Sequence, residues 1–137
     1  MDEDQGIAAM LARALAARAN AHAAYSGFQV GACLRGDKGG LYAGCNVENA
    51  AYPQSQCAEA GAISALVAAG ETRIVEVLVV AGGPALISPC GGCRQRLAEL
   101  AGPTVPVHLC DLEGRRRTVT MGELLPFAFT AASFRPA

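Results

Sequence analysis

The chain has 137 residues, which is enough for one domain with a buried core and too few for two ordinary ones. Apolar residues make up 52% of it, and 11 basic side chains nearly balance 12 acidic ones. The excess of positive charge typical of nucleic-acid-binding proteins is absent, so we expect a compact globular protein with no nucleic acid polymer as its partner.

The amino-terminal stretch "MDEDQGI" is acidic, whereas a secretory signal begins basic and continues with an apolar run. The longest apolar run, "IVEVLVVAGG", is too short to cross a bilayer. We therefore expect a cytoplasmic protein with no membrane partner. In that reducing compartment the six cysteines are not expected to form disulfides, so metal binding or catalysis becomes the explanation to test.

The first half of the chain predicts a helix followed by a β-hairpin. Residues 7–22 carry apolar side chains at spacings of three and four, typical of an amphipathic helix. This stripe comprises Ile7, Met10, Leu11, Ala14 and Leu15. Residues 28–35 alternate apolar and other side chains, and the glycine-rich turn "GDKGG" joins them to "LYAGC", which predicts the hairpin. A loop over 46–56 follows.

The second half alternates helices and strands. Residues 57–70 and 89–102 are predicted helices that each end at a glycine, and residues 74–80 and 105–110 are predicted strands. Such alternation indicates an α/β layered fold with parallel strand pairing.

The last connection reverses the chain direction. Only "DLEG" separates the strand at 105–110 from the next one at 115–121, and a parallel crossover needs a dozen residues or more. The last two strands should therefore be antiparallel neighbours. The basic cluster Arg115–Arg117 is interpreted as a solvated strand edge. A short helical turn, "GELLP", and a tail with three phenylalanines complete the sequence.

Cysteines begin two of the predicted helices. Cys57 begins one, and Cys90 and Cys93 begin the next. Successive crossover helices in a parallel sheet have their amino ends at the same edge, which brings the three sulfurs together. Three thiolates can hold one zinc ion. Glu59 follows Cys57 by two residues, and Cys-x-Glu combined with Cys-x-x-Cys matches the signature of zinc deaminases.

Further motifs extend the match across the chain. These are "YSGFQVGACL", "GCNVENAAYP", "SPCGGCRQRL" and "GELLPFAF". With them, residues 7–129 resemble a cytidine deaminase of the small, homotetrameric type that acts on free nucleosides. The resemblance implies a single domain over residues 1–137, built as a three-layer α/β/α sandwich around a mixed five-stranded sheet. Relatives that act on tRNA or polynucleotides usually return by a helix where this chain has "DLEG", which disfavours them.

The resemblance also implies the chemistry. Cys57, Cys90 and Cys93 would bind one Zn²⁺ per subunit and leave a fourth position for water, whose pKa a catalytic zinc lowers to about 7. Glu59 would take a proton from this water, deliver it to N3 of the pyrimidine as C4 is attacked, and help to protonate the departing amine. Cytidine and 2′-deoxycytidine would yield uridine and 2′-deoxyuridine plus ammonia, in pyrimidine salvage.

Substrate-binding residues follow from the same resemblance. Asn46 and Glu48 would bind the ribose hydroxyls, and Phe28 would pack against the base. The backbone of Ala58 and the carbonyl of Ser88 would read the edge of the pyrimidine. An acid and an amide that pair with the sugar favour nucleosides over free cytosine, because unpaired buried polar groups are costly.

Two aromatic residues bear on assembly. Tyr52 and Phe129 match positions that, in the family, approach the active site of a neighbouring subunit. The resemblance therefore implies a homotetramer with shared active sites.

One position departs from the family pattern. The commonest form has an arginine directly after the glutamate, where it contacts the ligand sulfurs, and this chain has Ala60. Zinc with three thiolates carries a net charge of minus one, which two helix amino ends offset only in part. Our hypothesis is that Arg94 or Gln56 supplies some of the missing compensation.

Three alternatives remain open at this point. The cysteines could form a structural zinc module, with Cys45 or Cys110 as a fourth thiolate, or Cys90 and Cys93 could be a thiol redox pair. The third is a deaminase of a cytosine nucleoside antibiotic, similar to the blasticidin type, which shares the zinc core and also lacks the arginine. The intact "NVENA" favours cytidine.

The remaining cysteines and the histidines are interpreted as structural. Free thiols on strands behave as small apolar side chains, and this applies to Cys33, Cys45 and Cys110. His22 and His108 match no ligand position, so each is interpreted as a surface or hydrogen-bonded core residue.

Overall fold

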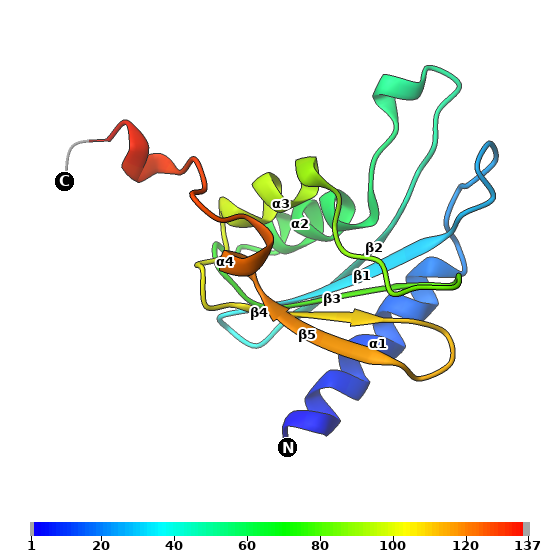
Figure 1. Ribbon diagram of the computed structural model, residues 1–137, viewed down its shortest axis with the longest axis horizontal. Coiled ribbons are helices and arrows are strands. Elements are labelled where there is room, and N and C mark those ends of the chain that lie inside the picture. The colour runs from blue at the N-terminus through cyan, green and yellow to red at the C-terminus, as the bar shows by residue number, and fades with distance from the viewer. Residues whose placement is uncertain (1, 136–137) are drawn as a thin grey trace.

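The computed structural model describes residues 2–135 of the chain (Figure 1). The helices are α1 (Glu3–Arg18), α2 (Ala58–Ala68), α3 (Gly91–Ala98) and α4 (Met121–Leu124), with 3-10 turns at Tyr52–Gln54 and Ala131–Ser133. The strands are β1 (Val30–Gly36), β2 (Leu41–Cys45), β3 (Ile74–Ala81), β4 (Pro106–Cys110) and β5 (Arg116–Thr120). Each predicted element is present, although several boundaries differ.

The strands form one mixed sheet in the order β2-β1-β3-β4-β5. Strands β3 and β4 are parallel, and every other neighbouring pair is antiparallel. The antiparallel pairing of β4 with β5 confirms the prediction made from the short connection. Because β1 lies between β2 and β3, the crossover through α2 passes over β1, and the strand and helix alternation yields only one parallel neighbouring pair.

Helices cover both faces of the sheet (Figure 1). Helix α1 packs on one face, over a cluster made of Ile7, Met10, Ala14, Cys33, Leu78, Val80 and Cys110. Helices α2 and α3 pack on the opposite face, over a larger cluster that includes Ala32, Leu34, Ala62, Leu66, Val77, Val79, Leu97 and Val107. Alternate residues of each central strand thus enter different cores, as the period of two in a strand requires. The predicted three-layer α/β/α sandwich is confirmed.

Helix α1 is displaced by four residues from the predicted span. It begins early because Asp2 and Gln5 form a capping box, in which each side chain accepts a hydrogen bond from the other residue's backbone N–H. It ends early because the backbone of His22 pairs with the loop: its N–H donates to the carbonyl of Asn46 at 3.0 Å, and its carbonyl accepts from the N–H of Glu48 at 2.8 Å. These long-range bonds override the local helical pattern.

The two cysteine-led helices end differently. Helix α2 closes as predicted at Gly70, which has a φ of +93° and donates its N–H to the carbonyl of Val67 at 3.0 Å. Helix α3 ends at Ala98, so the predicted extension to Gly102 is wrong. The reason is tertiary, because the carbonyl of Leu100 accepts a hydrogen bond of 2.9 Å from the N–H of Ile74 at the start of β3.

Helix α2 approaches the backbone of β2 directly at Gly44. A Cβ atom at this position would lie 2.4 Å from the carbonyl oxygen of Ala58 and 2.5 Å from the backbone nitrogen of Ala62. Both distances are shorter than van der Waals contact, so only glycine permits this packing. The contact fixes the first turn of α2, and with it Cys57, against the sheet.

The structural interpretations of Cys33, Cys110 and the two histidines are confirmed. Cys33 and Cys110 lie in the core beneath α1. His108 is buried, and its ring nitrogens form hydrogen bonds of 2.6 Å with Glu76 and 2.8 Å with Thr118. His22 is exposed at the surface.

The basic cluster lies where the sequence predicts. The three arginines at 115–117 are exposed, two of them on the outermost strand β5. Arg115 pairs with Asp111 at 2.5 Å and Arg116 with Asp4 at 3.4 Å. This is the solvated strand edge.

Candidate functional site

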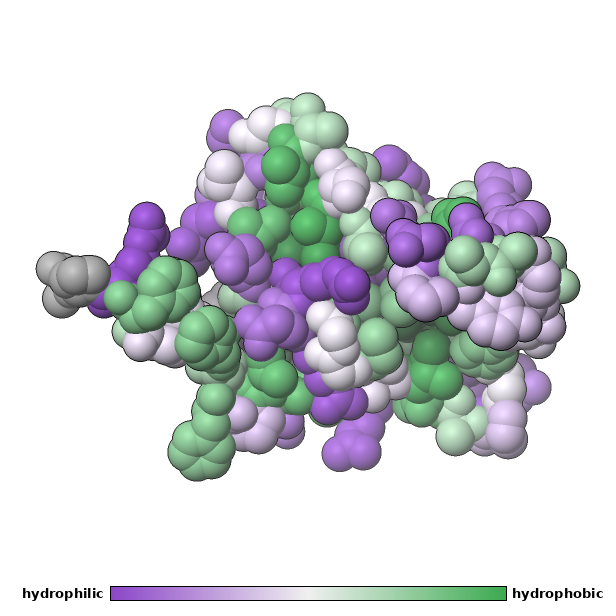
Figure 2. Space-filling model, turned by 90° about the horizontal axis from the view of Figure 1, so that it is seen from above, coloured by the Kyte–Doolittle hydropathy of each residue, from purple (hydrophilic) through white to green (hydrophobic). Residues whose placement is uncertain are grey.

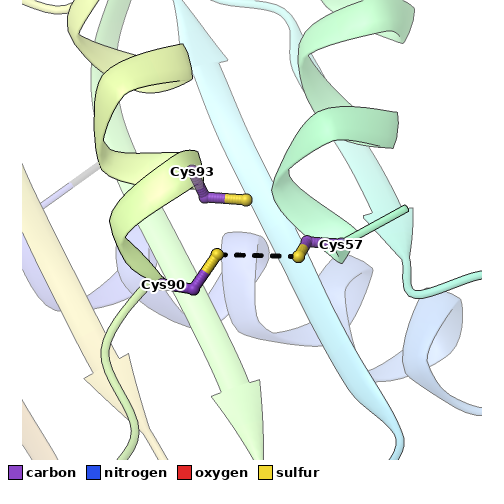
Figure 3. Close-up of side chains that lie close together, drawn as sticks. All are labelled: Cys57, Cys90 and Cys93. Atoms are coloured by element: carbon purple, nitrogen blue, oxygen red, sulfur yellow. Dashed lines mark hydrogen bonds between the residues drawn. The ribbon is translucent and has the colours of Figure 1, made fainter. Parts of the chain in front are cut away.

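Three cysteine sulfurs meet where α2 and α3 begin (Figure 3). Cys57 is the N-cap of α2, Cys90 is the N-cap of α3, and Cys93 lies in the first turn of α3. The Sγ atoms all lie within 4.8 Å of one another, and those of Cys57 and Cys90 are 3.7 Å apart. The two helices therefore present three sulfurs to one point from neighbouring amino ends.

This donor set fits zinc. Thiolate is a preferred zinc ligand, and three protein ligands that leave one open position are typical of catalytic rather than structural zinc sites. Within residues 2–135, no fourth metal-ligating side chain joins the group. Cys110 packs beneath α1 on the opposite face of the sheet, so it does not serve as the fourth thiolate that a structural site needs.

The three thiols differ in their tendency to ionise. Burial raises the pKa of the Cys57 and Cys93 thiols. The pKa of Cys90 is lowered, chiefly by the nearby backbone N–H of Cys93. Two of the three sulfurs thus favour the neutral thiol in the folded protein unless positive charge compensates them, as a bound metal ion does.

Glu59 lies beside the sulfurs in the first turn of α2 and is only 3% exposed. Burial raises the pKa of its carboxyl group, while the positive charge of Arg96 acts in the opposite direction. Its oxygens do not belong to the group of metal-ligating atoms. The carboxylate is therefore placed near the sulfurs without being one of the ligands.

A pocket of about 350 Å³ opens onto this cluster. It is lined by residues that the sequence singles out, namely Phe28, Asn46, Glu48, Cys57, Ala58, Glu59, Ser88 and Cys90. Val30 and Ile87 add apolar wall, and their part in the lining was not predicted. Predicted metal-binding, acid, base-packing and sugar-binding side chains, which lie up to 62 positions apart in the chain, are thus brought to one cavity.

The two polar residues of the "NVEN" motif are held in place by the preceding loop. The Oδ1 atom of Asn46 accepts from the N–H of Val30, and its Nδ2 atom donates to the carbonyl of Phe28, both at 2.8 Å. The carboxylate of Glu48 accepts hydrogen bonds from the hydroxyl and the N–H of Ser26. The hydroxyl contact is the main cause of the lowered pKa of Glu48, so this carboxylate is ionised at neutral pH.

Tyr52 and Phe129 lie outside this pocket. Tyr52 is 70% exposed, contacts the ring of Tyr25 edge-on, and lines a separate hollow next to Glu48. Phe129 is 63% exposed on the C-terminal tail, and its carbonyl accepts from the side chain of Gln95 at 2.8 Å. Figure 2 shows hydrophobic side chains of this tail standing clear of the body of the molecule.

The arginine that contacts one of the three sulfurs is not the one expected from the sequence. Arg94 donates to the carbonyls of Pro89 and Leu124 and to the hydroxyl of Ser88, so the hypothesis that it contacts a sulfur is wrong. The guanidinium that does so belongs to Arg96, whose Nη1 atom lies 3.9 Å from the Sγ atom of Cys93. The available signal was its spacing, because residues three apart on a helix share a face.

Gln56, the other hypothesised donor, is exposed. Its backbone pairs with Val47, in two hydrogen bonds of 2.9 Å. No hydrogen bond from its side chain to a ligand sulfur occurs in the described part of the chain.

Comparison with known proteins matches this arrangement. Residues 5–109 fit the family model described as the cytidine and deoxycytidylate deaminase zinc-binding region. The cytidine deaminase of Sporosarcina psychrophila is 40% identical over 121 residues, which are 88% of this chain and 89% of that relative. The chain belongs to the cytidine deaminase family of enzymes.

Solved structures agree with this family. The crystal structure of cytidine deaminase from Burkholderia pseudomallei superposes with a TM-score of 0.85 at 41% identity, over 94% of this chain and 100% of that one. The enzyme from Mycobacterium leprae gives 0.76 at 42% identity, over 88% and 97% of the two chains. The sandwich and its mixed sheet are therefore those of cytidine deaminases.

Proposed function

We propose that this protein is a zinc-dependent hydrolase that deaminates cytidine and 2′-deoxycytidine to uridine and 2′-deoxyuridine, with release of ammonia. The observation that carries the proposal is the cluster of three cysteine sulfurs beside a pocket that is lined by Cys57, Cys90 and the buried Glu59. The family supports it, because the curated relatives of similar sequence are named cytidine deaminases.

The roles of the four residues follow from their chemistry. Cys57, Cys90 and Cys93 would hold the zinc ion. When bound, zinc would act as a Lewis acid that makes water a nucleophile at neutral pH. Glu59 accepts a proton from the attacking water and donates it to N3 of the pyrimidine. It then carries a second proton to the amino group that leaves C4 as ammonia. Its burial keeps bulk water from competing for these protons.

Recognition of the nucleoside falls to the walls of the pocket. Asn46 and the ionised carboxylate of Glu48 would bind the sugar hydroxyls, and Phe28 would pack against the base. The N–H of Ala58 is in the first turn of α2, where it has no partner within the helix, and it would bind the pyrimidine together with the carbonyl of Ser88. A substrate that lacks the sugar leaves these polar groups unpaired, which disfavours free cytosine.

A direct comparison of substrates tests the proposal. We expect cytidine and 2′-deoxycytidine to lose ultraviolet absorbance with the zinc-loaded enzyme, and blasticidin S and free cytosine to react at least about 100-fold more slowly in kcat/KM, because they lose the sugar contacts of the pocket. The alternative of an antibiotic deaminase requires the opposite order for blasticidin S. Absence of reaction with every one of these compounds would refute the function.

We further propose a homotetramer in which Tyr52 and Phe129 complete the active site of a neighbouring subunit. Their exposure in the single chain, outside the pocket, is what supports this. In sedimentation the protein should have four times the chain mass of 14.0 kDa. Phe129→Ala and Glu59→Gln variants, each weakly active alone, should regain activity when they are refolded together, because a mixed assembly contains sites with both native residues.

If the activity of the mixture is only the average of the activities of the two variants, the active site is not shared between subunits.

A cytoplasmic role in pyrimidine salvage is part of the same proposal. It predicts that a host strain without its own cytidine deaminase, and unable to make pyrimidines, grows on cytidine only when it carries this gene. Failure to grow despite active enzyme in the extract would contradict that role.

A further inference from the structure

We infer that Arg96 is a positioning residue of the metal site, whose guanidinium stabilises the Cys93 thiolate and thereby strengthens zinc binding. The inference rests on the proposed zinc function. Arg96 projects from the second turn of α3, and its Nη1 atom lies 3.9 Å from the Sγ atom of Cys93. It lines no part of the substrate pocket, so its effect is exerted through the sulfur.

The charge balance of the site creates the need for such a residue. A zinc ion with three thiolates has a net charge of minus one, and the carboxylate of Glu59 adds another negative charge close by. Cys93 is fully buried and Glu59 is 3% exposed, so water screens these charges poorly. Over residues 2–135, Arg96 is the one arginine or lysine that donates a hydrogen bond to a ligand sulfur.

The chemistry of the guanidinium group suits this contact with the sulfur. An arginine suits this place better than a lysine, because it stays protonated at all relevant pH values and spreads its charge over a planar group.

The sequence around Arg96 makes room for this contact. A Cβ atom at Gly92 would lie only 3.1 Å from the Nη1 atom of Arg96, so the missing side chain clears the path back along the helix. Arg96 follows Cys93 by three residues, and Ala60 follows Cys57 by the same interval on α2. Residues at this spacing are neighbours on a helix surface. Each helix thus has a position three residues after a cysteine of the cluster, and this chain has an arginine at the one on α3.

The experiment compares zinc affinity among matched variants, measured by competition with a chromophoric chelator. Loss of an outer partner of a metal ligand typically costs about 10- to 100-fold in metal affinity, and we expect a loss of that size in Arg96→Gln, which keeps a donor and removes the charge. Arg96→Lys should restore most of the affinity. Arg73→Gln, which removes an exposed arginine at the far end of α2, should change it less than about twofold.

A relocated arginine provides a second test. The double variant Arg96→Gln/Ala60→Arg should regain most of the lost affinity, because the cation then follows Cys57 at the same three-residue spacing. In the cobalt-substituted proteins, the thiolate-to-metal charge-transfer band should shift in Arg96→Gln and return towards its original position in Arg96→Lys. A residue that matters only for folding would not move this band.

The outcomes separate the inference from the function on which it rests. If Arg96→Gln binds zinc as tightly as the unaltered protein and leaves the cobalt spectrum unchanged, Arg96 has no role in the metal site. In that case the unaltered protein still binds zinc, and the proposed function stands. If the unaltered protein itself binds no zinc, both the function and the inference are overturned.

Discussion

Replacement of Glu59 by glutamine should lower kcat by at least about 10²- to 10⁴-fold, the usual contribution of a general acid and base. Glutamine has nearly the same shape but cannot carry a proton between the water and the base. The side chain is not a metal ligand, so the zinc content and the thermal unfolding temperature should stay close to those of the unaltered protein. Steady-state kinetics and metal analysis on the same preparation check both statements.

Glu99→Gln is the matched control, since it makes the same change at an exposed position on the turn that closes α3. It should leave kcat within about twofold, as surface substitutions usually do. If Glu59→Gln retained full turnover, a carboxylate-driven deamination would be excluded. Deamination that persists in metal-free protein would exclude the zinc mechanism altogether.

Replacement of Cys93 by alanine should remove both zinc and activity. Cys93 is the only fully buried cysteine of the three. Its loss would leave two protein ligands, whereas catalytic zinc sites typically have three. We expect bound zinc to fall from about one per chain to a small fraction after dialysis, with a parallel loss of turnover. Metal analysis of dialysed protein and the ultraviolet assay measure the two effects.

Cys110→Ala distinguishes loss of a ligand from loss of packing. Cys110 is also a buried thiol, but it lies beneath α1 on the opposite face of the sheet. This variant should unfold at lower temperature, because it leaves a small void, and still bind zinc and turn over substrate. Equal zinc content in the two variants would show that Cys93 is not a ligand.

Local rules predicted the order of elements and one strand direction, but not every boundary. The four-residue connection "DLEG" was sufficient to predict the antiparallel pairing of β4 and β5, because chain length alone forbids a crossover. The end of α1 depends on the pairing of His22 with residues 46–48, and the end of α3 on the bond between Leu100 and Ile74. These hydrogen-bond partners are distant in sequence, so the local hydrophobic periodicity does not predict where the two helices end.

The candidate site shows a similar division. The three cysteines and Glu59 could be selected from their types and spacing, since few other functions require thiols and an acid at successive helix starts. Arg96 was not predicted, because the hypothesis placed the compensating charge at Arg94, the residue next to Cys93. Adjacent residues on a helix point in different directions, whereas residues three apart share a face. Tyr52 and Phe129 remain predictions, because the partner expected for them is another chain.

The close approach at Gly44 links the evolution of the sheet to that of the catalytic centre. Since main chain meets main chain there, a side chain at position 44 cannot be accommodated unless β2 or α2 moves. A mutation that separates β2 from α2 at Gly44 would also move the amino end of α2, where the Cys57 sulfur lies. Laboratory redesign of this enzyme will therefore have to keep Gly44 unchanged if the sulfur cluster is to stay intact.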